Sequence, residues 1–230
     1  GNTEVSGAQV TVTDEAENVG AGGNFTIDNT KPTVSSVGTQ FIKNGATSII
    51  TGSGFTTNGD ASGVKLGSTL IQGGNASYTV DSNTQITITG AGTDFTNQNV
   101  VVLDAAGNES TDSGKLLSID PKRPNITGIQ GSAPYIIKSG ATVQINGDND
   151  KFTTGSGTSS AEVDANILIN DTWPTGMTAT VSGNAVVITA GAGEVNGAVK
   201  IKDRAGNEHT NAGPVVIDNT APVVNSIGPD

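Results

Sequence analysis

The sequence predicts an all-β protein of tandem antiparallel sandwiches, on the basis of three observations. Short runs of alternating apolar residues, separated by Gly, Asn, Asp and Ser, recur along the chain. No window keeps apolar residues at helical spacing for more than about three turns. A hairpin-like segment also occurs three times, at residues 9–32, 99–124 and 198–222. Each copy consists of a strand, an Asp-x-Ala-x-Asn turn, a second strand ending in Ile-Asp, and then a Pro.

The spacing of these copies sets the size of the repeating module. The closing residues Pro32, Pro124 and Pro222 are 92 and 98 residues apart. A period of this size matches one immunoglobulin-like sandwich of about 100 residues. Because Pro fixes φ where each module begins, we expect sandwiches joined end to end by short Pro-containing linkers.

The repeat divides the chain into two complete modules and two partial ones. Residues 31–120 and 121–219 are the complete modules, residues 1–30 the closing hairpin of a preceding module, and residues 220–230 the first strand of a following one. The sequence therefore reads as a section of a longer array. An isolated hairpin is marginally stable in water. We therefore expect residues 1–30 to pack on the next domain or to meet a neighbouring chain.

Each complete module contains seven expected strands. In the first module they are residues 33–37, 46–52, 63–67, 77–80, 85–90, 99–104 and 115–120. In the second they are residues 126–129, 141–146, 166–170, 177–181, 185–190, 198–203 and 214–218. Internal matches relate the two modules, such as Ile88-Thr89-Gly90 with Ile188-Thr189-Ala190.

Composition excludes several classes of function. Lys and Arg total 11 against 22 Asp and Glu, so the net charge of −11 argues against nucleic acid and favours a divalent cation. No apolar run is long enough to insert into a membrane, and residues 1–20 do not resemble a signal peptide. The absence of Cys excludes disulfides and thiolate metal sites.

The sequence offers no catalytic residues, so we expect no enzyme. His209 is the only His, and no Ser lies in a Gly-x-Ser-x-Gly elbow, so a nucleophile and base cannot be paired. We interpret His209 as a solvated loop residue. A glycosidase cleft would need aromatic side chains, but Trp173 is the only Trp. We expect Trp173 to pack in the core or against a loop.

Several motifs resemble known families. Residues 48–55, SIITGSGF, together with VKLGS and VVVLDAAGN, resemble the TIG-type immunoglobulin-like domain. The DAAGN and DRAGN turns, with IDNTAP, resemble the tandem bacterial Ig-like repeats of large prokaryotic cell-surface proteins, including S-layer proteins and biofilm adhesins. The sequence departs from these families in two places. Residues 147–150 read Gly-Asp-Asn-Asp in place of Gly-Ser-Gly-Phe, which suggests a binding loop. Glu17 stands where the other two copies have Gly, which weakens the assignment of a turn at Asp14.

The resemblance implies a structural, non-catalytic segment of an extracellular protein at the cell surface or cell envelope. Its partners would be neighbouring copies in a surface layer, lattice or filament. The alternative is an adhesin module that binds a glycan or another surface ligand. A binding module concentrates aromatic or charged residues in loops at one end, whereas a spacer repeats its joints. The joints are the most repetitive feature here.

Sandwich topology also predicts calcium at the joints. The turn between the last two strands lies at the end where the first strand begins, and so does the loop after the second strand. Carboxylate and amide oxygens should therefore cluster there, and calcium takes six to eight oxygen ligands. The expected ligands are Asp28, Asp60, Asp104 and Asn108 at the first joint, and Asp120, Asp148, Asp150, Asp203 and Asn207 at the second. The alternative is that these residues only cap turns through Asx-type hydrogen bonds.

Overall fold

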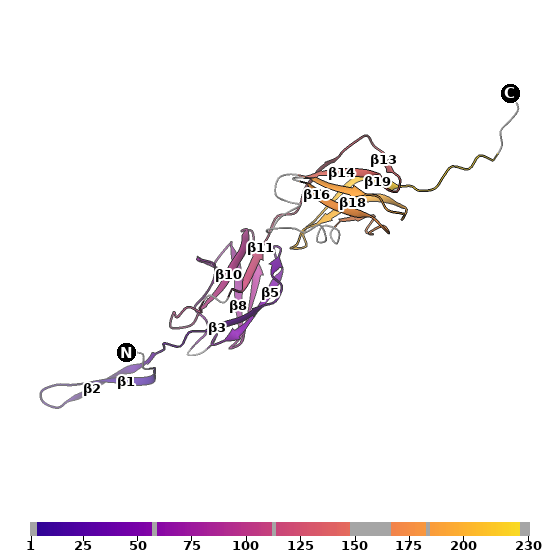
Figure 1. The fold of residues 1–230 in the computed structure, drawn as a ribbon. Helices are drawn as coiled ribbons and strands as arrows, with labels where there is room; N and C mark the ends of the chain where they lie inside the picture. The colour runs from indigo at the N-terminus through magenta and orange to yellow at the C-terminus, as the bar shows by residue number, and fades with distance from the viewer. Residues whose placement is uncertain (1–3, 57–58, 112–113, 148–166, 183–184, 226–230) are drawn as a thin grey trace, which may run out of the picture. The chain divides into compact units, whose positions relative to one another are not determined.

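The computed structural model describes residues 4–56, 59–111, 114–147, 167–182 and 185–225. The chain forms two compact units, Gly1–Pro121 and Lys122–Asp230, which are described separately. All the regular secondary structure of the described residues is β-strand, and no helix occurs among them (Figure 1). The described part of the chain accordingly holds no helix that could cross a membrane. The predicted all-β class is confirmed.

Unit 1 contains a complete two-sheet sandwich. One sheet has the order β3-β5-β9-β8, formed by Thr33–Val37, Thr47–Ser53, Gln85–Gly90 and Ala76–Ser82. The other has the order β4-β11-β10-β6-β7, formed by Phe41–Ile42, Leu116–Ile119, Phe95–Leu103, Gly63–Leu66 and Thr69–Leu70. Two sheets with these connections form the arrangement of an immunoglobulin-like sandwich.

Unit 2 repeats the same plan. Its first sheet has the order β12-β14-β17-β16, formed by Ile126–Ile129, Thr142–Gly147, Ala185–Thr189 and Thr178–Ser182. Its second has the order β13-β19-β18-β15, formed by Tyr135–Ile137, Glu208–Ile217, Val195–Lys202 and Ile167–Ile169. Apart from β7, which has no counterpart among the described strands of unit 2, strand order is therefore shared by two modules whose sequences match only in short segments.

The core of each sandwich lies between its two sheets. Alternation places Ile86 and Ile88 of β9 inward, where both are fully buried, and Ile188 of β17 occupies the equivalent place in unit 2. Each unit has its own cluster of buried apolar side chains. Trp173 packs partly buried against the cluster of unit 2, as the sequence predicts.

The first strand of each module changes sheets. In unit 1, β3 pairs antiparallel with β5, and the chain then crosses so that β4 pairs parallel with β11. In unit 2, β13 pairs parallel with β19 in the same way. Sequence periodicity missed β4, β7 and β13, because strands of two or three residues are too short to show alternation.

Residues 5–27 form a separate two-stranded hairpin within unit 1. Its strands are β1 (Val5–Thr13) and β2 (Val19–Ile27). Four of its apolar side chains are 40–67% exposed: Val10, Val12, Phe25 and Ile27. The residues at the equivalent positions of β18 and β19 are at most 4% exposed: Val199, Ile201, Val215 and Ile217. The hairpin therefore presents an apolar face that a complete sandwich covers with its opposing sheet.

Candidate functional site

The Asp-x-Ala-x-Asn turn has the same structure in its three copies. In unit 1 the Asp104 Oδ1 atom accepts hydrogen bonds from the backbone N–H groups of Ala106, at 2.9 Å, and Asn108, at 2.8 Å. The side-chain amide of Asn108 donates to Asp104 Oδ2 at 2.9 Å. In unit 2 Asn207 donates twice to the Asp203 carboxylate, both times at 2.9 Å. These are Asx-type bonds that close the hairpin turn.

The hairpin copy of the turn forms despite its Glu. Asp14 Oδ1 accepts from the backbone N–H groups of Ala16 and Asn18, each at 2.9 Å. Glu17 takes φ of +63°, where Gly107 has +86° and Gly206 +83°. The turn therefore forms at Asp14 although Glu17 stands where the other copies have Gly, and Glu17 adopts the left-handed conformation that Gly adopts without strain. Hydrogen bonds from the Asn18 side chain, more than those from backbone N–H groups, hold the pKa of Asp14 below its ordinary value.

In unit 1 the turn also holds the preceding linker. The Asn108 side-chain amide donates to the backbone carbonyl of Asp28 at 3.0 Å. Pro32 packs on the same module, since a side-chain carbon added at Gly54 would lie 3.2 Å from its Cα. Asp104 is 1% exposed beneath these contacts. A turn that caps itself therefore also fixes the start of the module.

The structure brings some of the expected calcium ligands together. Asp28, Asp104 and Asn108 meet at the first joint. Asp60 is exposed in the adjoining loop, where a side-chain carbon added at Gly59 would lie 3.1 Å from the Ala105 Cβ. The remaining ligands are distributed elsewhere: Asp203 and Asn207 form the turn of unit 2, Asp120 follows β11 in unit 1, and Asp148 and Asp150 lie outside the described residues.

The hydrogen bonds of the unit 1 turn fit the turn-capping alternative more closely than a metal cage. Asp104 Oδ1 already accepts two N–H bonds and Oδ2 accepts one, while the Asn108 amide directs its NH₂ group to Asp28. Calcium needs those oxygen lone pairs as ligands. No group of three or more His, Cys, Asp or Glu within the described ranges could hold a metal ion. Calcium at the joints stays a prediction.

A second cap, which sequence reasoning missed, lies just after β19, the last strand of the unit 2 sandwich. Asn219 Oδ1 accepts from the backbone N–H of Ser139 at 2.6 Å, and Asn219 Nδ2 donates to the carbonyls of Gly191 at 3.2 Å and Ala192 at 3.3 Å. Asn219 thus ties two loops to the strand end after β19. The repeated Ile-Asp-Asn-Thr of residues 27–30 and 217–220 was the available signal.

His209 corrects a further expectation. It lies in β19 rather than in a solvated loop, and its Nδ1 atom accepts a hydrogen bond from the backbone N–H of Ile126 at 2.7 Å. The imidazole is half-buried and joins the first strand of unit 2 to the last. Sequence reasoning missed this role because the two residues meet only in the folded sandwich.

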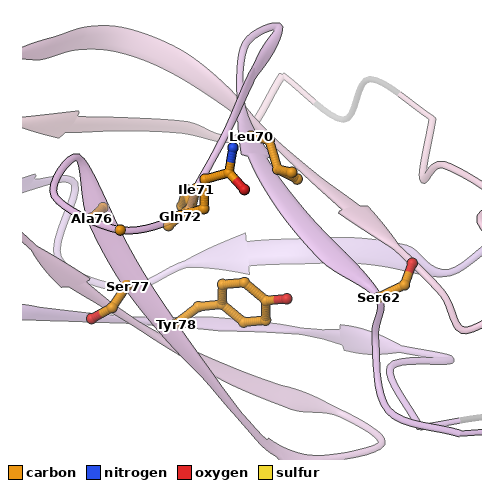
Figure 2. A pocket seen from close by; sticks show the side chains of 8 residues that line it. Ser62, Leu70, Ile71, Gln72, Ala76, Ser77 and Tyr78 are labelled. Carbon is orange, nitrogen blue, oxygen red and sulfur yellow. The ribbon is translucent and has the colours of Figure 1, made fainter.

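A pocket of about 330 Å³ opens at one side of the unit 1 sandwich (Figure 2). It lies between β7 and β8, which are edge strands of the two different sheets. Its lining comprises Ser62, Leu70, Ile71, Gln72, Gly73, Ala76, Ser77 and Tyr78. Figure 2 shows the Tyr78 ring extending from its strand toward the side where Ser62 lies. A second pocket, of about 400 Å³, is lined in part by Lys65 and Glu109. These two side chains form an ion pair, so their charges neutralise each other.

Comparisons with known proteins give only distant likenesses to solved structures. No protein-family model matches the chain, and no curated protein does so either. Similar solved structures include an I-band fragment of titin, with 12% identity over 84% of this chain and 66% of that one, at a TM-score of 0.39. The strand order within each unit is that of an immunoglobulin-like sandwich.

Two bacterial structures are also similar. The fibronectin(III)-like modules of Clostridium thermocellum CbhA share 15% identity over 82% of this chain and 94% of that one, at a TM-score of 0.35. The Bacteroides ovatus mixed-linkage glucan utilization locus protein SGBP-B, solved with a mixed-linkage heptasaccharide, shares 14% identity over 94% of this chain, at a TM-score of 0.33. This chain spans 55% of the length of SGBP-B. At these values the likeness concerns the fold alone.

Proposed function

We propose that the chain is a non-catalytic segment of an extracellular surface protein in which immunoglobulin-like modules are held in series by hydrogen-bonded joints. The bond from Asn108 to the Asp28 carbonyl carries this proposal. Because this turn holds the preceding linker by a hydrogen bond, it reduces the conformational freedom of the joint. The turn recurs along the chain and can do the same at each module. A series of such modules would serve to hold material at a set distance from a cell.

A distance measurement across the first joint tests the proposal. The chain contains no Cys, so a spin-label pair can be placed through Thr11→Cys on the hairpin and Thr79→Cys on β8, both at exposed positions. We expect a narrow distance distribution that Asn108→Ala broadens. A distribution equally broad with and without the Asn108 side chain would show a free hinge and overturn the architectural proposal.

Assembly into a surface layer or filament is the finer form of this proposal. The apolar face of Val10, Val12, Phe25 and Ile27 supports it, because exposed apolar patches of a soluble protein mark interaction surfaces. We expect light scattering to show association that grows with concentration, and Val12→Asp to reduce it. Electron microscopy of the associated protein would show the lattice or filament, and a chain that stays monomeric when concentrated would contradict it.

The second candidate function is adhesion to a glycan. The pocket beside Tyr78 favours it, because it combines an aromatic wall with polar groups at an open edge of the sandwich. Among the similar structures, the SGBP-B structure is a complex with an oligosaccharide. Screening the chain on an array of immobilised glycans tests adhesion as such. If the array retains no glycan, adhesion is contradicted and the architectural function is the only candidate left.

A further inference from the structure

We propose that the pocket between β7 and β8 of unit 1 binds a neutral carbohydrate. The inference deepens the second candidate function by naming a site and a ligand class. It rests on the chemistry of the lining, on the rigidity of the loop that forms it and on its place in the sandwich. The pocket volume, about 330 Å³, lies at the lower end of small-molecule sites and suits a short stretch of a chain rather than a large cofactor.

The lining has an apolar floor, an aromatic wall and a polar rim. Ile71 and Ala76 are buried beneath the pocket, and Tyr78 is half-buried, so that part of its ring remains accessible. Ser62, Gln72 and Ser77 supply hydroxyl and amide groups at the edge. A sugar ring has an apolar C–H face and a rim of hydroxyls, so an amphipathic aromatic ring beside polar groups complements it.

The charge of the lining selects among ligands. None of the eight lining residues carries a charge at neutral pH. A carboxylate, phosphate or sulfate ligand would lose its hydration without gaining a counter-charge. The protein as a whole has a net charge of −11, which further disfavours an anion. Neutral hexose or N-acetylhexosamine units therefore fit better than uronic acids.

Two of the rim side chains, Gln72 and Ser77, are available to a ligand, and their loop is held in place. The third, Ser62, already donates its hydroxyl to the backbone carbonyl of Asp104. Within the described part of the chain, the side chains of Gln72, Ser77 and Tyr78 make no hydrogen bond. The Gln72 backbone N–H donates to Asn75 Oδ1 at 2.9 Å, and Asn75 Nδ2 donates to the Leu70 carbonyl at 3.1 Å. These bonds fix the loop before a ligand arrives, which lowers the entropy cost of binding.

The approach to the pocket is open. Gly73, with φ of +63°, and Gly74 form the tip of the loop, and a side-chain carbon added at either would meet nothing within 4 Å. The neighbouring β7 and β8 are each the last strand of their sheet, so no further strand among the described residues extends either sheet on this side. A polysaccharide could therefore run past the pocket and place one or two units in it.

A titration of the whole chain, followed by NMR of its backbone amides, tests the proposal. The probes are the tetrasaccharides of β-1,4-linked glucose, α-1,4-linked glucose, β-1,4-linked mannose and β-1,4-linked N-acetylglucosamine, with a trimer of galacturonic acid as the anionic probe. We expect at least one neutral probe to bind with a dissociation constant of about 1 mM or below. Its shifts should centre on residues 70–78, and the galacturonate should leave them unchanged.

Variants separate the site from the fold. Tyr78→Ala and Gln72→Ala should each weaken binding, Tyr78→Ala by about tenfold or more. Tyr78→Phe keeps the ring that packs against the core and should retain most of the binding, which guards against a folding defect in Tyr78→Ala. Tyr135→Phe, in unit 2, is the matched control and should leave binding unchanged.

Two results would overturn the assignment in distinguishable ways. If a neutral probe binds but shifts residues outside 70–78, adhesion stands and the pocket is wrong. If every probe leaves the spectrum unchanged at about 10 mM, the pocket does not bind carbohydrate of these classes. Retention of other glycans on the array would then preserve adhesion, and retention of none would leave only the architectural function.

Discussion

The side-chain amide of Asn108 donates to the backbone carbonyl of Asp28, which lies 80 residues earlier in the chain. The same amide donates to Asp104 Oδ2, so one side chain closes its own turn and holds the linker of the preceding hairpin. Local turn chemistry and module linkage are therefore coupled. A change in the turn is also a change in the joint.

Asn108→Ala should weaken both unit 1 and its joint. A side-chain hydrogen bond contributes about 0.5–1.5 kcal/mol, so we expect a loss of about 1 kcal/mol or more in the free energy of unfolding of unit 1. Denaturant unfolding measures that loss, and nitrogen-15 relaxation should show faster motion of residues 5–27. Asn18→Ala is the control, because its turn lies at the far end of the hairpin from the Asp28 linker. Equal effects of the two variants on hairpin motion would contradict the coupling.

Ser48→Val should stabilise unit 1. The Ser48 hydroxyl is buried and has no hydrogen-bond partner among the described residues, whereas the equivalent position of unit 2 holds the buried Val143. Removing an unsatisfied buried hydroxyl and adding apolar surface should raise the free energy of unfolding by about 1 kcal/mol. Ser48→Ala tests the hydroxyl without added volume. A loss of stability in both variants would show that the hydroxyl has a partner in solution.

Gly52→Ala should disrupt the pairing of β3 with β5. A Cβ at Gly52 would lie 1.9 Å from the Thr33 carbonyl oxygen and 2.5 Å from Phe55 Cζ, so the backbone has to move. We expect a loss of about 3 kcal/mol or more in the free energy of unfolding. Gly92→Ala is the matched control, since its Cβ would meet nothing within 4 Å. Thermal unfolding of the two variants should differ clearly, and similar melting temperatures would contradict the close packing.

Acid should open the hairpin turn at Asp14. Bonds from Asn18 lower the pKa of this carboxyl in the folded turn, so its ionised form stabilises the turn. By linkage, the ionised Asp14 carboxyl stabilises the folded turn above the unfolded pKa of about 3.9. This stabilisation is lost as pH falls below that value towards the lowered folded pKa. Amide shifts of Ala16 and Asn18 should follow this loss, and Asp14→Asn should make them insensitive to pH. Shifts that persist in that variant would assign the titration to another group.

Calcium at the joints is tested by thermal melting. A ligand that binds only the folded joint stabilises it by mass action, so the prediction is a higher melting temperature when calcium is added to chelator-treated protein. Asp203→Ala should remove most of that shift. Turn capping predicts a different pattern, in which calcium has no effect and Asp203→Ala lowers the melting temperature equally with and without it, because the variant loses bonds from Asn207. Calorimetry that detects no binding at millimolar calcium would exclude the metal.

The sequence predicts those features that local patterns determine. Gln85–Gly90 was predicted with its observed bounds, because alternation marks a strand that is buried on one side. Topology alone placed the turn of Asp104 and Asn108 beside the linker at Asp28. Features that arise from tertiary contact escaped prediction: β4 depends on its pairing with β11, and the role of His209 depends on where Ile126 lies. The pocket beside Tyr78 escaped for the same reason, since two sheet edges form it.

The parallel pairing of the first and last strands has a consequence under mechanical load. A force applied through the two ends of a module pulls β4 and β11 in opposite directions along their common axis. Their hydrogen bonds run across that axis and are therefore strained together, in shear, instead of opening one at a time from an end. The same holds for β13 and β19. A module with this pairing should therefore resist extension through its two ends more strongly than a module whose terminal strands separate one hydrogen bond at a time.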